Sequence, residues 1–450
     1  MIINKQRKKI HNTATHSFNA GTEKNSGKLI SLGLLSTFVY TVLTFYSNQS
    51  TAIDITPYIA LFAIAFALYG YMAYQIFHHN SNPSIKIIIG FSIVFHIIGI
   101  IATPQFEDDF FRYLWDGYIF FESGNPYQHA PSDYFSDTSI PAIYQNLLNQ
   151  INYPDIKTIY APLLQYSFWL SHGLFPADIL GLKIIYSVCN LAIIFMLVTL
   201  TKARNILLYA WNPLIIKEVA FTAHPDILGI VFLIAVIYFF STKPKTAAIC
   251  LGLSVCSKPF AWIIAVYILF RFKLTQCILF FLTIVVMYTP FLMAGNESSG
   301  LFAFGQHWEF NAAIYSLFSY LMPNPHAKML CGGLFIAVMI YYFILFRKTT
   351  VANIRGDLLI GSLLLLSPVI NPWYLLWVLP FTAMRNYITP WVMSFALLFS
   401  YFSGINLHSE HLQAYQLAIW VKPVEYTLMV CAITYDTRKY LANQPYHSYH

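Results

Sequence analysis

The acidic side chains of this sequence are concentrated in one stretch that could carry out proton transfer. That stretch begins at Glu107 and reads Glu-Asp-Asp-Phe-Phe-Arg-Tyr-Leu-Trp-Asp-Gly. In an α-helix, residues at i, i+3, i+4 and i+7 share one face. The residues at these positions are Asp109, Arg112, Tyr113 and Asp116. Two carboxylates beside a guanidinium and a phenol could accept a proton and bind an anion. The alternative is a solvated helix with a surface pair between Asp108 and Arg112.

A second polar cluster interrupts an apolar stretch between Trp211 and Asp226. It contains Lys217, Glu218, His224 and Asp226. An ionisable group near the centre of a bilayer costs about 2.5–3.5 kcal/mol, so such groups usually face a cavity or a partner. Lys217 and Glu218 could form a simple ion pair. His224-Pro225-Asp226, where one helix must end and another begin, instead favours a functional site.

Two further polar breaks are Ser257-Lys258-Pro259-Phe260 and Asn371-Pro372-Trp373-Tyr374. A snorkelling lysine and an interfacial aromatic belt would explain each of them singly. The predicted topology, however, places all four breaks at the same membrane face, which favours one shared site. An anionic lipid phosphate would suit it, with Lys258, His224 or Arg112 neutralising the leaving phosphate. A carboxylate such as Asp109 could take the proton of an attacking hydroxyl.

The composition shows what must position these residues. Of the 450 residues, 57% are hydrophobic and only 10% are charged, whereas soluble domains average about 25% charged residues. The apolar residues form blocks of roughly 16–22, which is typical of membrane-spanning helices. We therefore predict an all-α integral membrane protein. Disorder and a soluble globular fold are excluded by the same pattern.

The distribution of charge predicts the topology. The net charge of +7 comes largely from basic residues before the first apolar run and in alternate short loops. This is the positive-inside pattern, so we infer no nucleic-acid partner. We predict a basic cytoplasmic tail over 1–28, a transmembrane domain over 29–433, and a short cytoplasmic tail over 434–450. Both termini would be cytoplasmic, and an external loop would cover about 104–178.

About 11–14 membrane spans are predicted. Several are shorter than the roughly 20 residues that a crossing helix needs, so some of them could be broken or re-entrant. The first three cover about 29–46, 57–77 and 87–103. Within the external loop, Leu163–Phe175 is predicted to be an amphipathic helix at the outer interface, because a further crossing would place a basic loop outside. Further along the chain, the predicted spans include 206–222, 226–240, 374–384, 388–405 and 415–433.

Cofactor motifs are sparse. The six cysteines show no CxxC spacing, and no metal ligand set is predicted. Asp108 and Asp109 could bind a divalent cation, although two adjacent carboxylates are weak evidence for one. Neither GxGxxG nor GxxxxGK[ST] occurs in the sequence, so an activated sugar would have to arrive on a membrane lipid.

The strings Asp108-Asp-Phe-Phe-Arg-Tyr-Leu-Trp-Asp-Gly117 and Gly124-Asn-Pro-Tyr127 resemble the first external loop of polytopic GT-C glycosyltransferases. The bacterial mannosyltransferase-like group that uses polyprenyl-phosphate sugars is the most similar. The other three polar breaks are similar to recurring stretches of that group, and the resemblance covers roughly 85–385. The chain departs from it in having Pro225 between His224 and Asp226, and Ala161-Pro162 where Tyr-Pro-Pro is typical.

The resemblance implies a GT-C-like bundle with juxtamembrane helices in the first external loop. It selects Asp109 as catalytic base, with Asp108 as its neighbour. Residues expected to contact substrate are Arg112, Tyr113, Asp116, Asn125, Tyr127, Glu218, His224, Asp226, Lys258, Trp373 and Tyr374.

The expected activity is that of an inverting glycosyltransferase at the outer face of the cytoplasmic membrane. It would move a hexose, expected to be mannose, from a polyprenyl-phosphate donor to a lipid- or glycan-borne hydroxyl. A transporter or flippase of lipid-linked sugars is the alternative, with Lys217, Glu218 and Asp226 on an ion path. A membrane assembly or polymerase component without transferase activity is a third hypothesis.

Overall fold

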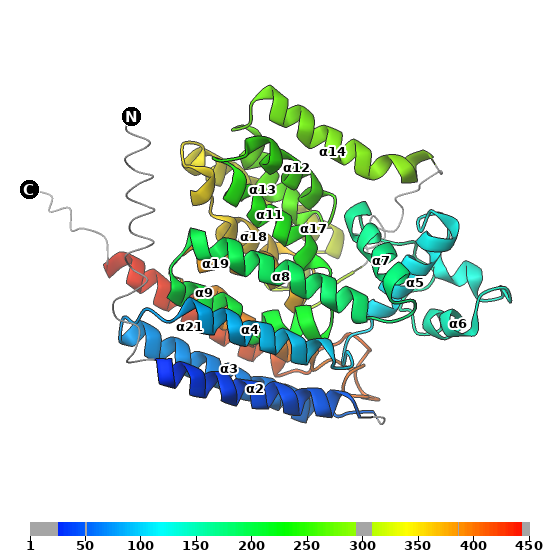
Figure 1. The fold of residues 1–450 in the computed structure, drawn as a ribbon, viewed down its shortest axis with the longest axis horizontal. Coiled ribbons are helices and arrows are strands. Elements are labelled where there is room, and N and C mark those ends of the chain that lie inside the picture. Colours follow the sequence, from blue (N-terminus) through cyan, green and yellow to red (C-terminus); the bar gives the residue numbers. More distant parts are fainter. Residues whose placement is uncertain (1–25, 50–51, 294–307, 386, 443–450) are drawn as a thin grey trace, which may run out of the picture.

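The protein is almost entirely helical in its computed structural model (Figure 1). The structure describes residues 26–49, 52–293, 308–385 and 387–442. Within these ranges the only β-type pairings are two isolated bridges. The predicted fold class, an all-helical polytopic membrane protein, is confirmed. Most of the predicted tail 1–28 and the last part of the tail 434–450 lie outside the described residues.

Three long helices form one side of the bundle. They are α2 (Ser26–Ser47), α3 (Ile55–His78) and α4 (Ile85–Ile100), and they run side by side in Figure 1. The Asp54 side chain accepts a hydrogen bond from the Thr56 backbone N–H at 2.8 Å and so caps the start of α3. α2 packs against both α3 and α4, and α4 in turn packs against the central helices.

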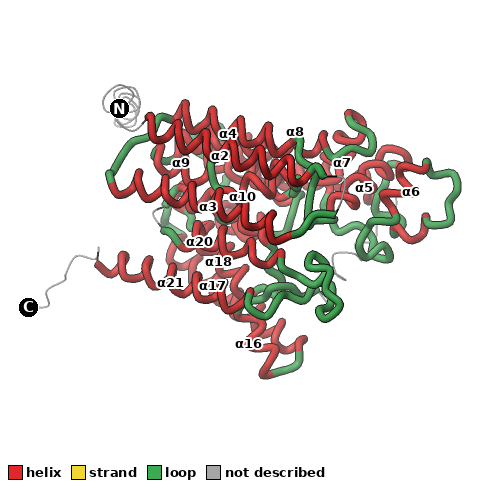
Figure 2. The backbone as a smooth tube through the Cα atoms, turned by 90° about the horizontal axis from the view of Figure 1, so that it is seen from below, coloured by secondary structure: helices red, strands yellow, loops and turns green. Residues whose placement is uncertain are grey.

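The segment after α4 forms a lobe at one end of the bundle (Figure 1). It contains α5 (Asp109–Ser123), η1 (Pro131–Tyr134), α6 (Ala142–Leu148) and α7 (Pro162–Leu174). We refer to residues 104–178 as the lobe. The prediction of a helix at Leu163–Phe175 is confirmed by α7, while its location at an interface stays a prediction. Figure 2 shows that many of the loops and turns of the protein lie at this same end.

A close helix contact fixes α5 within the lobe. A Cβ atom on Gly117 would lie 2.6 Å from the backbone oxygen of Phe168, so only glycine permits this approach of α5 to α7. Gly124, at φ +78°, ends α5 in the left-handed conformation that glycine adopts without strain. Trp115 and Leu148 lie in a separate small core between α5 and α6.

The central helices are interrupted where the second polar cluster lies. Asn212 caps a short helix through bonds from the backbone N–H groups of Leu214 and Ile215. A five-residue π-helical segment follows, and the chain then turns by 119° into α11. The candidate span 206–222 is therefore one of the broken ones, whereas 226–240 is confirmed as a helix by α11. The central elements are α8 (Leu180–Leu200), α9 (Ala203–Ala210), α10 (Pro213–Ile216), η2 (Lys217–Phe221), α11 (Asp226–Phe239), α12 (Pro244–Val255), α13 (Phe260–Leu269) and α14 (Leu274–Met293).

The C-terminal third is more broken than its hydropathy suggests. The predicted spans 374–384 and 388–405 are each split into short helices, and the helix predicted over 415–433 begins only at Val421. Pro372, Pro380 and Pro390 begin or interrupt these pieces because proline supplies no backbone N–H. The elements are α16 (Ile314–Leu321), α17 (Asn324–Phe346), η3 (Val351–Asn353), α18 (Gly356–Leu366), η4 (Pro372–Trp377), α19 (Leu379–Ala383), α20 (Thr389–Ala396), η5 (Leu397–Tyr401) and α21 (Val421–Ala442).

Among the described residues, five helices are long and apolar enough to cross a bilayer, namely α2, α3, α8, α14 and α17. The bent pair Pro213–Phe221 and Asp226–Phe239 would make a sixth. Four shorter apolar helices are α4, α12, α13 and α18. The predicted count of about 11–14 is higher, because several predicted spans are short or broken helices. Wide apolar faces of α14 and α17 remain exposed, as expected of surfaces that meet lipid.

Candidate active site

The adjacent carboxylates Asp108 and Asp109 lie at the start of α5, where the lobe meets the bundle. Asp108 accepts a short hydrogen bond from the Asn152 side chain. The Tyr113 hydroxyl lies 3.5 Å from Asp109, one turn along the helix as predicted. Burial, followed by the charges of Asp108 and Glu107, raises the pKa of Asp109 to about 7. A carboxyl group with such a pKa is suited to act as a base near neutral pH.

The other two residues of the predicted face form a buried anchor. Arg112 donates to Asp116 at 2.8 Å and to the backbone oxygen of Ile156 at 2.9 Å. Asp116 also accepts hydrogen bonds from Thr158 at 2.5 Å and from Gln165 at 2.9 Å. The Asp108–Arg112 surface pair that the sequence left open is therefore not formed. These contacts tie α5 to α7 and to the preceding loop, and they indicate that Arg112 and Asp116 position Asp109.

Thr158→Val is expected to destabilise the lobe by about 2 kcal/mol, because it removes a hydrogen bond to a charged, buried acceptor without changing side-chain shape. Limited proteolysis of the lobe in the detergent-purified protein would measure the loss. Ser139→Ala, on an exposed bond to Asp137 in the same lobe, is the matched control. Equal protease resistance of the two variants would contradict an anchoring role for Asp116.

Asn125 and Tyr127 shape the turn after α5. The Asn125 side chain accepts from the Tyr127 backbone N–H at 3.0 Å, and the Tyr127 hydroxyl donates to the Tyr160 backbone oxygen at 2.7 Å. The Tyr127 ring packs against Phe291 of α14, with centroids 5.0 Å apart. Their predicted contact with substrate stays a prediction.

The bend between η2 and α11 brings ionisable groups together beside the start of the lobe. Lys217 Nζ lies 3.3 Å from Glu218 Oε1 and 3.8 Å from Glu107 Oε1. The ion pair between Lys217 and Glu218, which the sequence left open, is formed. The Tyr401 hydroxyl lies within hydrogen-bond distance of both Glu218, at 2.9 Å, and Glu107, and its single proton can go to either. Lys217 lies over the Tyr401 ring. We call Glu107, Lys217, Glu218, His224 and Tyr401 the buried charge cluster.

His224 is the least satisfied member of this cluster. Its Nε2 lies 3.3 Å from Glu218 Oε2 and 3.5 Å from Glu107 Oε1. Neither ring nitrogen has a hydrogen-bond partner among the described residues, although the side chain is only 1% exposed. The imidazole stacks on Trp373, with ring centroids 3.9 Å apart. This places two residues of different predicted polar breaks in direct contact.

Lys258 and Asp226 connect the remaining breaks. Lys258 Nζ lies 2.6 Å from Asp226 Oδ2, and the Trp377 indole N–H donates to Asp226 Oδ1 at 2.7 Å. Lys258 also lies over the ring of Tyr374. Both Lys258 and Asp226 affect the pKa of Asp109, Lys258 lowering it and Asp226 raising it. The four predicted polar breaks therefore converge on one place.

Three residues of the same region have an unusual backbone conformation. Phe106, Tyr153 and Ala223 have positive φ angles of 61°, 51° and 58°, which non-glycine residues rarely adopt. Each precedes or follows a residue described above: Glu107, Asn152 and His224. Strain of this kind is often found at functional sites, where the surrounding structure holds it in place.

Four residues of this region were missing from the predicted set: Glu107, Lys217, Trp377 and Tyr401. Glu107 could have been found, since it directly precedes Asp108 in the acidic stretch. Lys217 was seen in its cluster but not assigned a role in binding. Tyr401 lies in the apolar string Leu-Leu-Phe-Ser-Tyr and carries no pattern that points to the site.

One group of side chains could hold a metal ion. Ligand atoms of Glu107, Glu218 and His224 all lie within 4.8 Å of one another. The Lys217 ammonium group, however, already contacts both carboxylates and supplies a positive charge there. A divalent cation would have to displace it. These residues therefore fit a lysine-neutralised cluster better than a cation site.

A match to known proteins extends over most of these residues. Residues 14–272, more than half of the chain, match the family described as "Alpha-(1->6)-mannopyranosyltransferase, N-terminal domain". The chain belongs to this family. The predicted kinship with GT-C-like mannosyltransferases is thereby confirmed. No curated protein and no solved structure gives a significant match.

The matched segment of this mannosyltransferase carries Asp108, Asp109, the broken helix and Lys258. The segment that bears Trp373 and the helix that bears Tyr401 lie beyond it, so the site is assembled from both parts of the chain.

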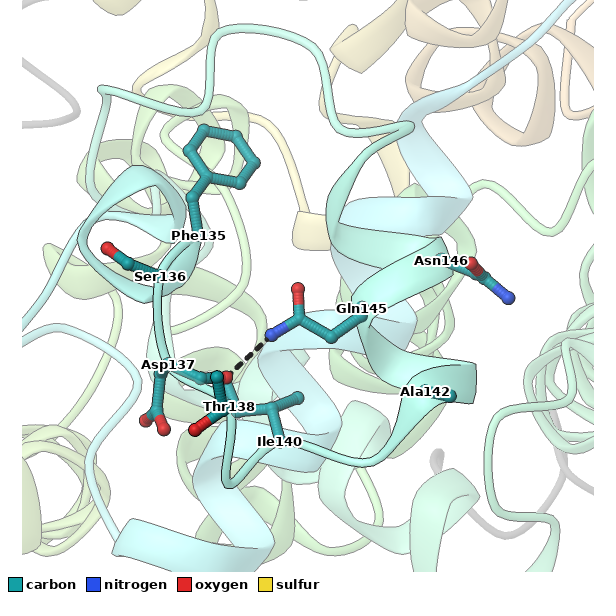
Figure 3. Close-up of a pocket in the computed structure, with 8 residues that line it drawn as sticks. All are labelled: Phe135, Ser136, Asp137, Thr138, Ile140, Ala142, Gln145 and Asn146. Atoms are coloured by element: carbon teal, nitrogen blue, oxygen red, sulfur yellow. Dashed lines mark hydrogen bonds between the residues drawn. The ribbon is translucent and has the colours of Figure 1, made fainter.

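A separate exposed pocket lies between η1 and α6 (Figure 3). Its carboxylate, Asp137, is already bonded by Ser139. Asp137 and seven uncharged residues line this pocket, so it offers no cation for a phosphate.

Proposed function

We propose that this mannosyltransferase takes mannose from a polyprenyl-phosphate donor and transfers it to a glycan- or lipid-borne hydroxyl. The observation that carries the proposal is the carboxyl group of Asp109. Burial raises its pKa to about 7, and the positive charge of Lys258 acts on the same group by lowering that pKa. A base for the acceptor and a cation for the donor phosphate are the two groups that such a transfer requires.

The reaction is a single displacement with inversion. Asp109 removes the proton of the acceptor hydroxyl as its oxygen bonds to C1 of mannose. The bond between C1 and the phosphate oxygen breaks, and polyprenyl phosphate leaves with the electron pair. Lys258 neutralises the phosphate. We assign His224, which is stacked on Trp373, to the same phosphate site. Arg112 is not assigned to the phosphate, because its guanidinium is bonded to two groups of the lobe, Asp116 and Ile156. Lys258 is bonded to Asp226, and its ammonium group carries three donors, so it can contact a phosphate as well.

A lipid donor suits a site that lies among apolar helices. Lys258 lies in the short segment between α12 and α13, and its neighbour Tyr374 belongs to η4. The basic loops of the sequence favour an orientation with both termini in the cytoplasm and the lobe outside. We assign the protein to the cytoplasmic membrane, with its active site at the outer face. Residues 29–433 form the transferase domain, between short cytoplasmic tails.

The decisive experiment uses the full-length protein in lipid nanodiscs with an octyl α-(1→6)-dimannoside as acceptor. Labelled mannose is supplied as polyprenyl-phosphate mannose or as GDP-mannose, and labelled glucose as polyprenyl-phosphate glucose. We expect transfer from the first donor in its β-anomeric form, and inversion at C1 then gives an α linkage in the product, which NMR would show. Transfer from GDP-mannose alone would overturn the lipid donor. Passage of the lipid-linked sugar across a vesicle membrane without transfer would favour a flippase.

Lys258→Gln is expected to raise the KM for the donor by about tenfold to a hundredfold, because a charge-assisted hydrogen bond to phosphate contributes about 1.5–3 kcal/mol. The KM for the acceptor should change little. Steady-state kinetics with polyprenyl-phosphate mannose would measure both. Lys245→Gln, on an exposed lysine in the first turn of α12, is the control. A donor KM equal to that of the wild type would remove Lys258 from the phosphate site.

A further inference from the structure

Three aromatic side chains from distant parts of the chain meet beside the carboxylates of the site. The ring of Trp308 lies 4.7 Å from that of Tyr153 and 5.2 Å from that of Tyr415, centroid to centroid. Tyr153 and Tyr415 are 6.1 Å apart and nearly parallel. Tyr153 is 44% exposed, and the other two are partly exposed. We call these three residues the aromatic cluster.

Tyr153 is joined to the candidate catalytic carboxylates through its neighbour. The Asn152 side chain donates to Asp108, so the backbone that carries the Tyr153 ring also holds this carboxylate. Tyr153 itself has a positive φ angle of 51°, which non-glycine residues rarely adopt. Such a strained conformation persists only where the surroundings fix it.

Trp308 is joined to the loop that carries Trp373. The backbone N–H of Phe310 donates to the Pro368 oxygen at 3.0 Å, and that of Ile370 donates to the Phe310 oxygen at 2.9 Å. This short pairing places Trp308 next to the strand-like segment that leads directly into η4. The position of the indole is thus set relative to Trp373 and Tyr374.

Tyr415 is joined to the helix that carries Tyr401. Backbone bonds from Gly404 to Gln416 and from Ile405 to Ala414 fold residues 403–417 back on themselves just after η5. Burial raises the pKa of the Tyr415 hydroxyl, and the charges of Asp108 and Asp109 raise it further. The Tyr415 ring itself packs beside Tyr153, the neighbour of Asn152, whose side chain donates to Asp108. The three rings of the aromatic cluster are therefore attached to three different segments of the active site: the loop that carries Asn152, the segment before η4 and the segment after η5.

We propose that the aromatic cluster is the acceptor subsite and binds a pyranose ring of an α-(1→6)-linked mannoside. This inference rests on the proposed function. Pyranose rings present C–H groups on their faces, which pack on the electron-rich faces of aromatic rings, and the tyrosine hydroxyls can bond to sugar hydroxyls. The three rings lie in one cluster, whereas the exposed faces of α14 and α17 are mainly aliphatic, with Phe281 and Tyr341 among their exposed residues. Its position beside Asp108 and Asp109 would hold an acceptor hydroxyl near the base.

The test measures acceptor kinetics for Trp308→Ala with octyl α-mannoside and with octyl α-(1→6)-dimannoside in nanodiscs. We expect the KM for the dimannoside to rise about tenfold, which corresponds to about 1.4 kcal/mol. The KM for the donor and kcat at saturating acceptor should stay within about twofold. Trp308→Phe should restore most of the affinity. Phe135→Ala, on an exposed ring elsewhere in the lobe, should have no effect.

Two results would overturn the proposal: an unchanged acceptor KM in Trp308→Ala, or a loss confined to kcat. If this variant fails to fold, Tyr153→Ala takes its place, because that ring is the most exposed of the three. Equilibrium dialysis with tritiated dimannoside separates this proposal from the proposed function. Binding that is lost in Trp308→Ala would support the subsite even if no donor were used, whereas equal binding by both proteins would refute it.

Discussion

Asp109→Asn is expected to lower kcat for mannosyl transfer by about 10²–10⁴, the usual contribution of a positioned general base. The substitution keeps the size of the side chain and leaves the helix intact, so donor binding should persist. Single-turnover assays in nanodiscs at equal protein concentration would measure the change. Asp137→Asn, which alters an exposed carboxylate of the same lobe, should retain wild-type rates. Undiminished transfer by Asp109→Asn would exclude this residue as the base.

The pH dependence provides an independent check on Asp109. Since its pKa is raised to about 7, the rate should increase with pH through this value as the base loses its proton. Asp108 is the largest electrostatic cause of that shift after burial. Asp108→Asn should therefore move the acidic limb of the profile to lower pH. Glu107 also has a pKa raised to about 7, so the limb reports coupled groups and not one residue alone.

The same shift predicts a change in stability. A carboxyl group whose folded-state pKa lies above its ordinary value of 3.8 favours folding when it is protonated. This contribution is present at low pH and is lost as the pH rises towards about 7. Asp109→Asn should thus be at least as stable as the wild type at neutral pH. A lower melting temperature would indicate that the carboxylate supports the fold.

Lys217→Met is expected to destabilise the protein by about 3–5 kcal/mol, because it leaves buried carboxylates without their cation. The side chains of Lys217 and Glu218 are 0% exposed and that of Glu107 is 7% exposed. Methionine fills a similar volume, so lost charge compensation is the main effect. Thermal unfolding in detergent should show the loss, while Lys245→Met, at an exposed position in the first turn of α12, should show none.

Two further measurements distinguish loss of charge compensation from simple misfolding: the stability of a double variant and the pH dependence of the destabilisation. The double variant Lys217→Met/Glu218→Gln removes one buried charge of each sign and should recover part of the stability. Lys217 lowers the pKa of Glu107, so its loss should leave Glu107 protonated over a wider pH range. The deficit of Lys217→Met should then be smaller at pH 6 than at pH 8. A deficit that is independent of pH would point to packing instead of charge.

The sequence by itself determined the features that depend on neighbours along the chain. The apolar blocks gave a helical membrane protein, and helical periodicity placed Asp109, Arg112 and Tyr113 correctly on α5. The breaks at His224-Pro225-Asp226 and Asn371-Pro372 were visible because proline and clustered charge interrupt helices locally. Whether these residues bind substrate stays a prediction that the variants above test.

Only the tertiary structure decided which of these groups meet. The register between separate helices depends on packing, and no local pattern encodes it. Glu107 and Tyr401 share a hydrogen bond although 294 residues separate them, and the aromatic cluster joins three loops. The pair Arg112–Asp116 is local, four residues apart on α5, but packing added its further partners Thr158 and Gln165. Local sequence thus supplied the chemical groups, and long-range contacts between helices determined their partners.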